Sequence, residues 1–352
     1  MKKFILFFTL ILILSACGNY EDDTLALSGY EELSDSEESA ENDELVNKEE
    51  EEVIEENVTE VAEEKLVEET PIENEIKEDK SEESTKSEEP ANPKDNEIVR
   101  GNVSSNYAEY PNKSLSWWYK VPKPTHQEVP ADIDNGVKAI LEKYDGIWQY
   151  PKDEKVVYIT MDEGYEFEEN SNKILDIARD KNFKITFFIT GDFIRQRPDL
   201  VKRMYNEGHL VGNHTNKHLN GPRALEESDE RLINDITSIE SMYRDLTGTD
   251  LQPFFRPPEG VYSERSLKIV NDLGYRPVFW SFAYKDWETN NQPSREFALD
   301  KITGQLHNGS VLLIHAVSKT NVEILPELVD TIRAKGFRID TIDNIPSNQA
   351  GY

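Results

Sequence analysis

Short apolar runs and amphipathic stretches alternate along the chain from about residue 155 onward. The apolar runs are rich in β-branched and aromatic residues, which predicts buried strands. They cover residues 156–161, 184–190, 210–213, 253–256, 277–281, 311–315 and 337–341. Between them, apolar residues recur every three or four positions, which predicts helices. These cover residues 172–181, 198–207, 229–246, 263–273, 295–306 and 321–334. Strands that alternate with helices predict an α/β fold with a parallel sheet, either doubly wound or closed into a barrel.

The segment before this alternation has a weaker pattern. An aromatic cluster at residues 114–119 is the first sign of order, and residues 131–144 have the apolar spacing of a helix. We therefore expect an N-terminal extension over residues 106–150, packed on a main domain over residues 151–346.

Residues 18–105 have the composition of a disordered chain. Residues 21–100 contain 32 Asp and Glu against 7 Lys and Arg, so most of the formal net charge of −31 lies there. Such a segment cannot bury enough apolar area to offset its ordering entropy. We predict a disordered acidic linker, which is either a spacer between membrane and wall or a solvated tail. Neither part of the chain offers a basic footprint, so we expect no nucleic-acid partner.

The first 17 residues are typical of a secretory signal. Lys2 and Lys3 precede an apolar run at residues 4–14, and small residues lead to Cys17. The string LSAC at residues 14–17 resembles a bacterial lipobox, which implies that Cys17 is lipidated. The alternatives are a cleaved signal with an incidental cysteine, or an uncleaved anchor. We expect an extracytoplasmic, membrane-anchored, monomeric lipoprotein, without a disulfide because Cys17 is the only cysteine.

Titratable residues follow several predicted strands, where parallel α/β folds build their sites. Asp162, Glu163 and Gly164 come directly after the strand at residues 156–161. Of two adjacent carboxylates, one can act as a base and the other as a metal ligand. Acidic pairs after strands are also often solvated loop residues, so this pair by itself does not establish a catalytic site.

Two histidines follow the strand at residues 210–213. The i,i+4 spacing of His214 and His218 predicts that both imidazoles lie on one face of a helical turn, as a divalent metal requires. The alternative is a pair of unrelated surface histidines.

The string RPPEG at residues 256–260 follows the next strand. Its prolines and glycine predict a rigid loop that can aim a backbone N–H at a reacting oxygen, and Arg256 can hold a carboxylate. An ordinary structural turn is the alternative.

His315 ends a very apolar strand, and Asp286 and Trp287 follow another. A histidine at the mouth of a buried strand, oriented by an aspartate, suits a general acid. A structural histidine is the alternative reading of His315 taken alone.

Taken together and in this order, these strings resemble the polysaccharide deacetylases of carbohydrate esterase family four, the NodB-homology domain. The matching strings are TMDEG at 160–164, HTNKH at 214–218, RPPEG at 256–260, DW at 286–287 and LLIH at 312–315. The resemblance spans residues 152–345 and implies a distorted (β/α) barrel of seven strands. Further strings at 117–119, 126–127, 143–146, 158–166 and 310–319 are similar to the peptidoglycan deacetylases that lead to muramic δ-lactam, which act on N-acetylmuramic acid.

The resemblance implies a role for each residue. Asp162 is the base, Arg256 pairs with it, and His315, positioned by Asp286, is the general acid. His214 and His218 hold a divalent metal, zinc or else cobalt or manganese, with Glu163 as a third ligand. The backbone N–H of Glu259 helps to bind the oxyanion that forms during the reaction. Trp287 forms one wall of the substrate pocket, and Gly164 is a further residue that faces the substrate. The expected substrate is a cell-wall glycan.

Four residues depart from the pattern of the family or its subgroup. Glu163 stands where the family usually has Asp, Met161 where it usually has Phe, and Glu259 where it often has Tyr or Arg. Leu219 follows His218 where the subgroup tends to have Pro. The resemblance as a whole implies an enzyme that removes N-acetyl groups from peptidoglycan, with N-acetylmuramic acid as the target. The alternatives are a deacetylase of N-acetylglucosamine or chitin-type polymers, and a glycan-binding lipoprotein with weak catalysis.

Overall fold

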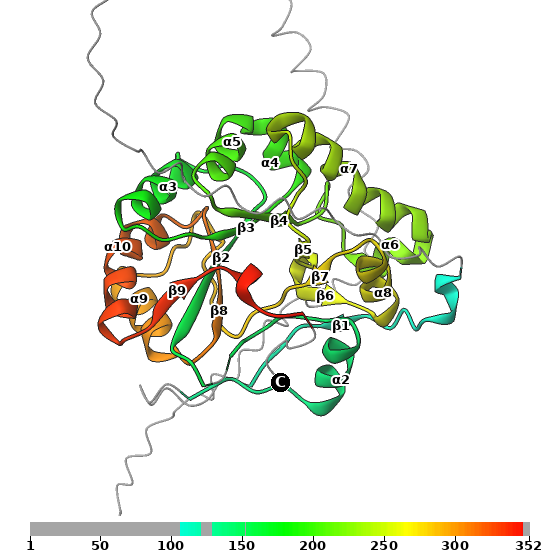
Figure 1. Cartoon of the computed structure of the whole chain (residues 1–352), viewed down its shortest axis with the longest axis horizontal. Helices are drawn as coiled ribbons and strands as arrows, with labels where there is room; N and C mark the ends of the chain where they lie inside the picture. Colours follow the sequence, from blue (N-terminus) through cyan, green and yellow to red (C-terminus); the bar gives the residue numbers. More distant parts are fainter. Residues whose placement is uncertain (1–105, 121–128, 152, 348–352) are drawn as a thin grey trace, which may run out of the picture. The chain divides into compact units, whose positions relative to one another are not determined.

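A computed structural model describes residues 106–120, 129–151 and 153–347. Cys17, the signal segment and the whole acidic linker lie outside these residues. A seven-stranded sheet forms the centre of the described part (Figure 1). Its strands are β2 (Val156–Glu163), β3 (Thr186–Ile189), β4 (Leu210–Asn213), β5 (Phe254–Phe255), β7 (Arg276–Pro277), β8 (Ser310–His315) and β9 (Arg338–Asp340). Neighbours in the order β7-β5-β4-β3-β2-β8 pair in parallel, and β9 also pairs with β2.

Helices surround this sheet on its outer side (Figure 1). They are α3 (Asn170–Asp180), α4 (Gly191–Gln196), α5 (Pro198–Asn206), α6 (Gly221–Glu227), α7 (Asp229–Thr247), α8 (Glu264–Asp272), α9 (Arg295–Gly304) and α10 (Lys319–Ala334). The six helices predicted after residue 155 are confirmed within a few residues. Helices α4 and α6 were not predicted because one or two turns are too short to show a period. Side-chain caps start them: Thr190 accepts a hydrogen bond from the Phe193 N–H, and Asn220 accepts one from Arg223.

The sheet curls into a distorted barrel, as expected from the resemblance. Strands β5 and β7 are two residues long, shorter than predicted, and a segment from the N-terminal extension pairs with the chain just after β7. The Ile147 N–H donates to the Pro277 carbonyl at 2.8 Å, and the Phe279 N–H donates to Ile147 at 2.7 Å. Beyond β7 the chain reaches β8, where Phe282 pairs with Leu312 in parallel. This bridge connects the two ends of the strand order.

The two faces of β2 pack into different cores. Val157, Ile159 and Met161 belong to the core between the sheet and the helices. Val156 and Tyr158 belong to a second core inside the barrel, with aromatic residues of the N-terminal extension. Because side chains alternate along a strand, the continuation of β2 sends residues 160 and 162 to the barrel side and residue 163 to the helix side.

The N-terminal extension packs against the barrel through short elements. These are the 3₁₀ turn η1 (Tyr107–Glu109), strand β1 (Leu115–Ser116) and helix α2 (Asn135–Lys143), and β1 pairs antiparallel with β6 (Val261–Tyr262). The Trp117 ring stacks on Phe279 with 4.4 Å between centroids. Two further 3₁₀ turns, η2 (Pro258–Gly260) and η3 (Ile342–Asn344), complete the described elements.

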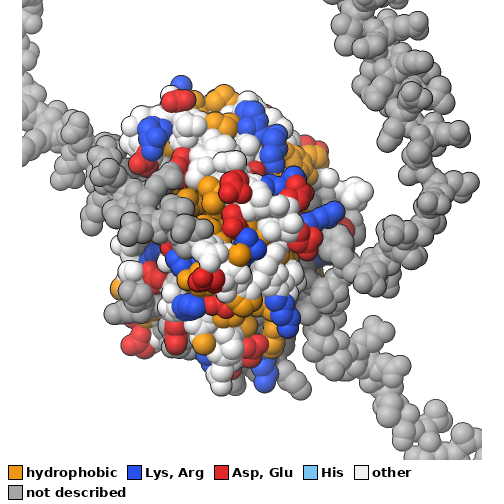
Figure 2. Space-filling view, turned by 90° about the vertical axis from the view of Figure 1, so that its right-hand side faces the viewer, with side chains coloured by type: hydrophobic (Ala, Val, Ile, Leu, Met, Phe, Trp, Pro, Cys, Tyr) orange, Lys and Arg blue, Asp and Glu red, His pale blue; other side chains and the backbone are white. Residues whose placement is uncertain are grey.

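Positive and negative side chains are interspersed on the face that Figure 2 shows, with small apolar areas between them. Among the described residues, no helix combines the length and the apolar character that crossing a membrane requires.

Candidate active site

The predicted site residues gather where the parallel strands end. Asp162 closes the barrel-facing side of β2, His214 follows β4, Arg256 follows β5 and His315 ends β8. Asp162 and His315 are paired positions in the β2–β8 ladder. The ladder therefore puts a carboxylate and an imidazole side by side at one rim of the barrel.

An ion pair inside the barrel mouth joins Asp162 to Arg256. The Arg256 Nη1 donates to Asp162 Oδ1 at 2.7 Å, and its Nη2 donates to the Thr160 hydroxyl at 2.8 Å. The guanidinium is fully buried and lies over the Phe188 ring, 4.1 Å from its centroid. A buried guanidinium needs such partners because an unpaired charge in this environment is costly.

The same ion pair sets the protonation state of Asp162. Burial by itself would raise the pKa of this carboxyl, but the Arg256 guanidinium, helped by His214 and His315, outweighs burial and lowers it. Asp162 is therefore a carboxylate at neutral pH. Its second oxygen, Oδ2, lies 3.5 Å from His214 Nε2. As a carboxylate oxygen, it can accept a proton from a bound molecule.

His214 is a neutral imidazole with one free nitrogen toward the site. Burial lowers the pKa of His214 to about 4. Its Nδ1 lies 2.9 Å from the Arg256 carbonyl oxygen, which can only accept, so Nδ1 carries the proton. The lone pair is therefore on Nε2, which faces Asp162. This tautomer is the one that a metal-binding histidine uses.

His218 lies beside His214, with 4.8 Å between ring centroids. The pair does not sit on a helical turn, contrary to the sequence-based expectation: residues 214–220 form a loop, with positive φ at Thr215 (67°) and His218 (56°). Asp235 of α7 holds this loop, because its carboxylate accepts from the Lys217 and Leu219 N–H groups at 2.9 and 3.3 Å. Packing from a distant helix thus brings the two rings together.

On the other side of Asp162, His315 is bound tightly to Asp286. Its Nδ1 donates to Asp286 Oδ1 at 2.7 Å, and its backbone N–H donates to Oδ2 at 2.8 Å. Asn321 of α10 donates to the same Oδ2 at 2.7 Å and to the His315 carbonyl at 3.0 Å. The carboxylate and the amide together fix the ring, so Nε2 is the nitrogen left for chemistry.

Asp286 also favours the protonated form of His315. Burial would lower the pKa of this imidazole, but the Asp286 carboxylate outweighs burial and raises it. The Trp287 ring lies against His315 at a steep angle, 5.6 Å between centroids, and is 37% exposed. An imidazole whose pKa is raised, beside a partly open aromatic wall, suits a proton donor to a bound substrate.

The loop at residues 256–260 is shaped by its backbone. Glu259 adopts φ 59°, which is uncommon for a residue with a side chain, and Gly260 follows at 67°. A Cβ at Gly260 would lie 2.7 Å from the Trp280 ring, so only glycine fits there. The Glu259 carboxylate accepts from the Asn220 side chain at 2.9 Å, which ties this loop to the histidine loop.

The structure does not bring Glu163 to the histidine pair. Strand β2 runs through residue 163, so the alternation of the strand turns this side chain toward α3. There the Ser171 hydroxyl donates to Glu163 Oε2 at 3.2 Å, while Oε1 is buried without a hydrogen-bond partner. Burial, and then the nearby Glu166 carboxylate, raises the pKa of Glu163 well above its ordinary value.

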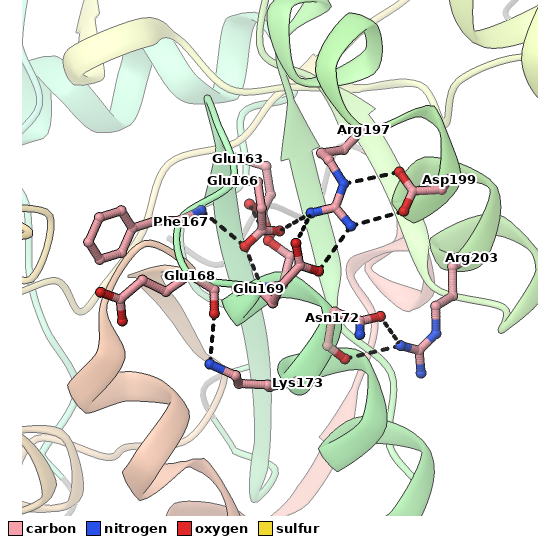
Figure 3. Close-up of polar contacts among 11 residues, drawn as sticks. Glu163, Glu166, Phe167, Glu168, Glu169, Asn172, Lys173, Arg197, Asp199 and Arg203 are labelled. Carbon is pink, nitrogen blue, oxygen red and sulfur yellow. Dashed lines mark hydrogen bonds and ion pairs between the residues drawn. The ribbon is translucent and has the colours of Figure 1, made fainter. Parts of the chain in front are cut away.

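Figure 3 shows the surroundings of Glu163, which include Glu166 and Arg197. Arg197 forms ion pairs with Glu169 at 2.8 Å and with Asp199 at 2.9 Å, and lies 3.8 Å from Glu166. The loop after Gly164 is therefore anchored to the start of α5. Gly164 itself has a partly exposed backbone at the rim, and its carbonyl accepts from the Thr190 hydroxyl at 3.1 Å.

The donor set fits a metal ion in part. His214 presents a nitrogen lone pair, the His218 ring is adjacent to His214, and the Asp162 carboxylate lies 3.5 Å from the His214 Nε2. Among the residues that the structure describes, however, no three His, Cys, Asp or Glu side chains are arranged to hold a metal together. Two imidazoles are the protein ligands that the geometry offers, with water or substrate left to complete the shell.

Three supporting residues were not singled out from the sequence: Thr160, Asp235 and Asn321. Thr160 bridges Arg256 to the Leu312 carbonyl, to which its hydroxyl donates at 2.6 Å. The alternation of β2 could have placed Thr160 beside Asp162, since both lie on one face. Asp235 and Asn321 lie on helices far along the chain, and no local signal marks them.

Comparison with known proteins agrees with this geometry. The family model for polysaccharide deacetylases matches residues 149–278. The chain is 35% identical over 235 residues to the peptidoglycan-N-acetylmuramic acid deacetylase PdaA of Bacillus subtilis, covering 67% of this chain and 87% of PdaA. It is 30% identical over 203 residues to a peptidoglycan-N-acetylglucosamine deacetylase of Bacillus cereus, covering 56% of this chain and 91% of that relative. The solved structure of Bacillus subtilis PdaA, a family 4 carbohydrate esterase, matches with a TM-score of 0.62 and 33% identity, over 67% of this chain and 97% of that one. The chain therefore belongs to the polysaccharide deacetylases, the enzymes of carbohydrate esterase family 4.

Proposed function

We propose that this enzyme removes N-acetyl groups from the amino sugars of peptidoglycan outside the cytoplasm, with N-acetylmuramic acid as its target. One observation carries the proposal. A carboxylate with a lowered pKa, Asp162, lies register-paired with an imidazole whose pKa is raised, His315. A base and an acid on neighbouring strands are what amide hydrolysis requires. The similarity to PdaA supports the choice of sugar.

The chain's own residues account for the proton transfers. Asp162 takes the proton from the attacking water, and Arg256 keeps this carboxylate ionised and oriented until then. The backbone N–H of Glu259 donates to the oxyanion that forms on the acetyl carbonyl. His315, held by Asp286 and Asn321, gives its Nε2 proton to the departing amine. The products are acetate and a free amino sugar.

His214 and His218 are the residues that would hold a divalent metal, zinc or else cobalt or manganese. When bound there, such an ion would lower the pKa of a water molecule and polarise the acetamide carbonyl. The neutral tautomer of His214 supports this role, because its Nε2 lone pair faces the space beside Asp162.

A second candidate target is N-acetylglucosamine, and Glu259 favours it. Muramic acid carries a lactyl group, which is a carboxylate wherever no stem peptide is attached. Glu259 places a second carboxylate at the rim, and like charges at close range repel. Similarity to the Bacillus cereus N-acetylglucosamine deacetylase also supports this alternative.

The decisive experiment compares intact and peptide-stripped glycan. Purified protein loaded with zinc, cobalt or manganese is incubated with each, and free amines are mapped by mass spectrometry. We expect free amine on muramic acid residues. Free amine only on glucosamine residues would establish the second candidate. Retained glycan binding without acetate release under any metal would make the protein a binding module.

We further propose that Cys17 is lipidated and that the acidic linker acts as a spacer between the membrane and the wall. The arrangement of charges supports the role as a spacer, because the linker holds most of the net charge, while the described part carries interspersed charges of both signs. Deleting residues 20–100 is then expected to leave activity on soluble glycan unchanged.

The pH profile tests the pairing of His315 with Asp286. The basic limb of kcat/KM reports the free enzyme's general acid, and we expect it above the ordinary histidine range because Asp286 raises the pKa of His315. In Asp286→Asn the main influence that raises the pKa of His315 is lost, burial then outweighs the Asp162 carboxylate, and the limb moves to lower pH. Glu288→Gln removes the same charge two residues away, where the carboxylate pairs with Lys285, and is expected to leave the limb in place. An unmoved limb in Asp286→Asn would remove His315 as the acid.

A further inference from the structure

Three exposed aromatic side chains stand at the mouth of the barrel. Tyr165 is 46% exposed and directly follows Gly164, while Trp287 is 37% exposed and directly follows Asp286. The third, Trp118, is 46% exposed and comes from the N-terminal extension. Large aromatic rings left in water at the rim of a site are typical of binding surfaces.

A hydrogen bond from the neighbouring residue places Trp118 beside the loop at residues 256–260, the oxyanion loop. Leu115 is paired with Tyr262 and Ser116 with Val261, and the Trp117 N–H donates to the Gly260 carbonyl at 2.8 Å. Gly260 is the last residue of the oxyanion loop, and Trp118 directly follows the residue that is bonded to it. Trp117 is buried in the core, whereas Trp118 is 46% exposed.

Both neighbours of Trp118 are fixed to the barrel. The Trp117 indole N–H donates to the Trp280 carbonyl at 3.0 Å. The Tyr119 hydroxyl accepts from the Ala283 N–H at 2.7 Å, and Ala283 leads to Asp286. The segment 117–119 therefore spans from the oxyanion loop to the loop that carries Asp286 and Trp287. Its backbone is set before any substrate arrives, which lowers the entropic cost of binding.

We infer that Trp118 is a specificity-determining residue whose indole stacks on a sugar ring next to the one that is attacked. This inference rests on the proposed function, since it names how a glycan polymer is held at the same site. The C–H face of a pyranose ring is apolar, and a flat indole matches it in area and shape. Contact with a sugar remote from the reacting acetamide contributes binding energy that a short fragment cannot supply.

The test measures acetate release from glycan substrates of graded length, from a single N-acetylated amino sugar to long strands. For the unmodified protein, kcat/KM is expected to rise with length. Trp118→Ala is expected to lose about fivefold to tenfold on long strands, through KM, and to match the unmodified protein on the single amino sugar. Trp118→Phe, which keeps an aromatic face, is expected to recover most of the loss.

Phe297→Ala is the matched control. Phe297 is an aromatic side chain on α9, 54% exposed, outside the strand-end loops, and its loss is expected to leave the length dependence unchanged. Equal loss at every length in Trp118→Ala, or no loss at all, would overturn the inference while the deacetylase activity stands. Absence of acetate release from any strand by the unmodified protein would instead overturn the proposed function.

Discussion

Replacing Asp162 with Asn is expected to slow acetate release by about 10²- to 10⁴-fold, the range for loss of a general base. Asn keeps the shape of the side chain and an oxygen that can accept from Arg256, but it cannot take a proton. The Arg256 guanidinium keeps this carboxyl ionised in the unmodified site, and so able to accept a proton, whereas the amide of Asn is not a base. The measurement is kcat/KM on glycan, with metal content determined in parallel.

The same substitution removes the charged partner of a buried arginine. Breaking a buried pair costs up to about 3–5 kcal/mol, so the free energy of unfolding must be measured alongside the rate. Asp199→Asn is the matched control, because Asp199 pairs with Arg197 at the surface, and such pairs are worth about 1 kcal/mol or less. A folded Asp162→Asn protein with nearly full activity would exclude Asp162 as the base.

Replacing His214 with Ala is expected to remove the bound metal and to lower activity by roughly 10³-fold, several kcal/mol of barrier. The imidazole is fixed by the Arg256 carbonyl and presents Nε2 to the site, so its loss leaves His218 alone. Metal content by mass spectrometry and the rate of acetate release after addition of zinc, cobalt or manganese are the two measurements.

Glu163→Gln is the contrasting variant for this experiment. Glu163 lies on the helix side of β2 with Ser171, away from the histidines, so we expect metal content to be kept and activity to change less than about threefold. Loss of metal in Glu163→Gln as complete as in His214→Ala would mean that Glu163 is a ligand in the loaded protein. Its side chain would then have left Ser171.

The alternation of apolar runs was sufficient to predict the sheet, because strand and helix periods are local properties. Strand β4 matched at both ends, and the helices matched within a few residues. Strands β5 and β7 were predicted too long. Just after β7 the chain pairs with Ile147 of the N-terminal extension, which is too far along the chain for a local pattern to reveal. The short helices α4 and α6 depend on caps more than on period.

The candidate site also depends partly on local sequence patterns and partly on contacts between distant segments. The order of strands and polar residues along the chain was enough to predict which residues lie at the candidate site, since Asp162, His214, Arg256 and His315 each end or follow an apolar strand, and parallel strands end at one rim. Which of them come into contact depends on tertiary packing: Asp235 holds the histidine loop, and Asn321 with Asp286 fixes His315. It also separated Asp162 from Glu163, which are adjacent in sequence but lie on opposite faces of β2. The physical reason is that strand β2 extends through residue 163, and successive side chains along a strand point to opposite faces.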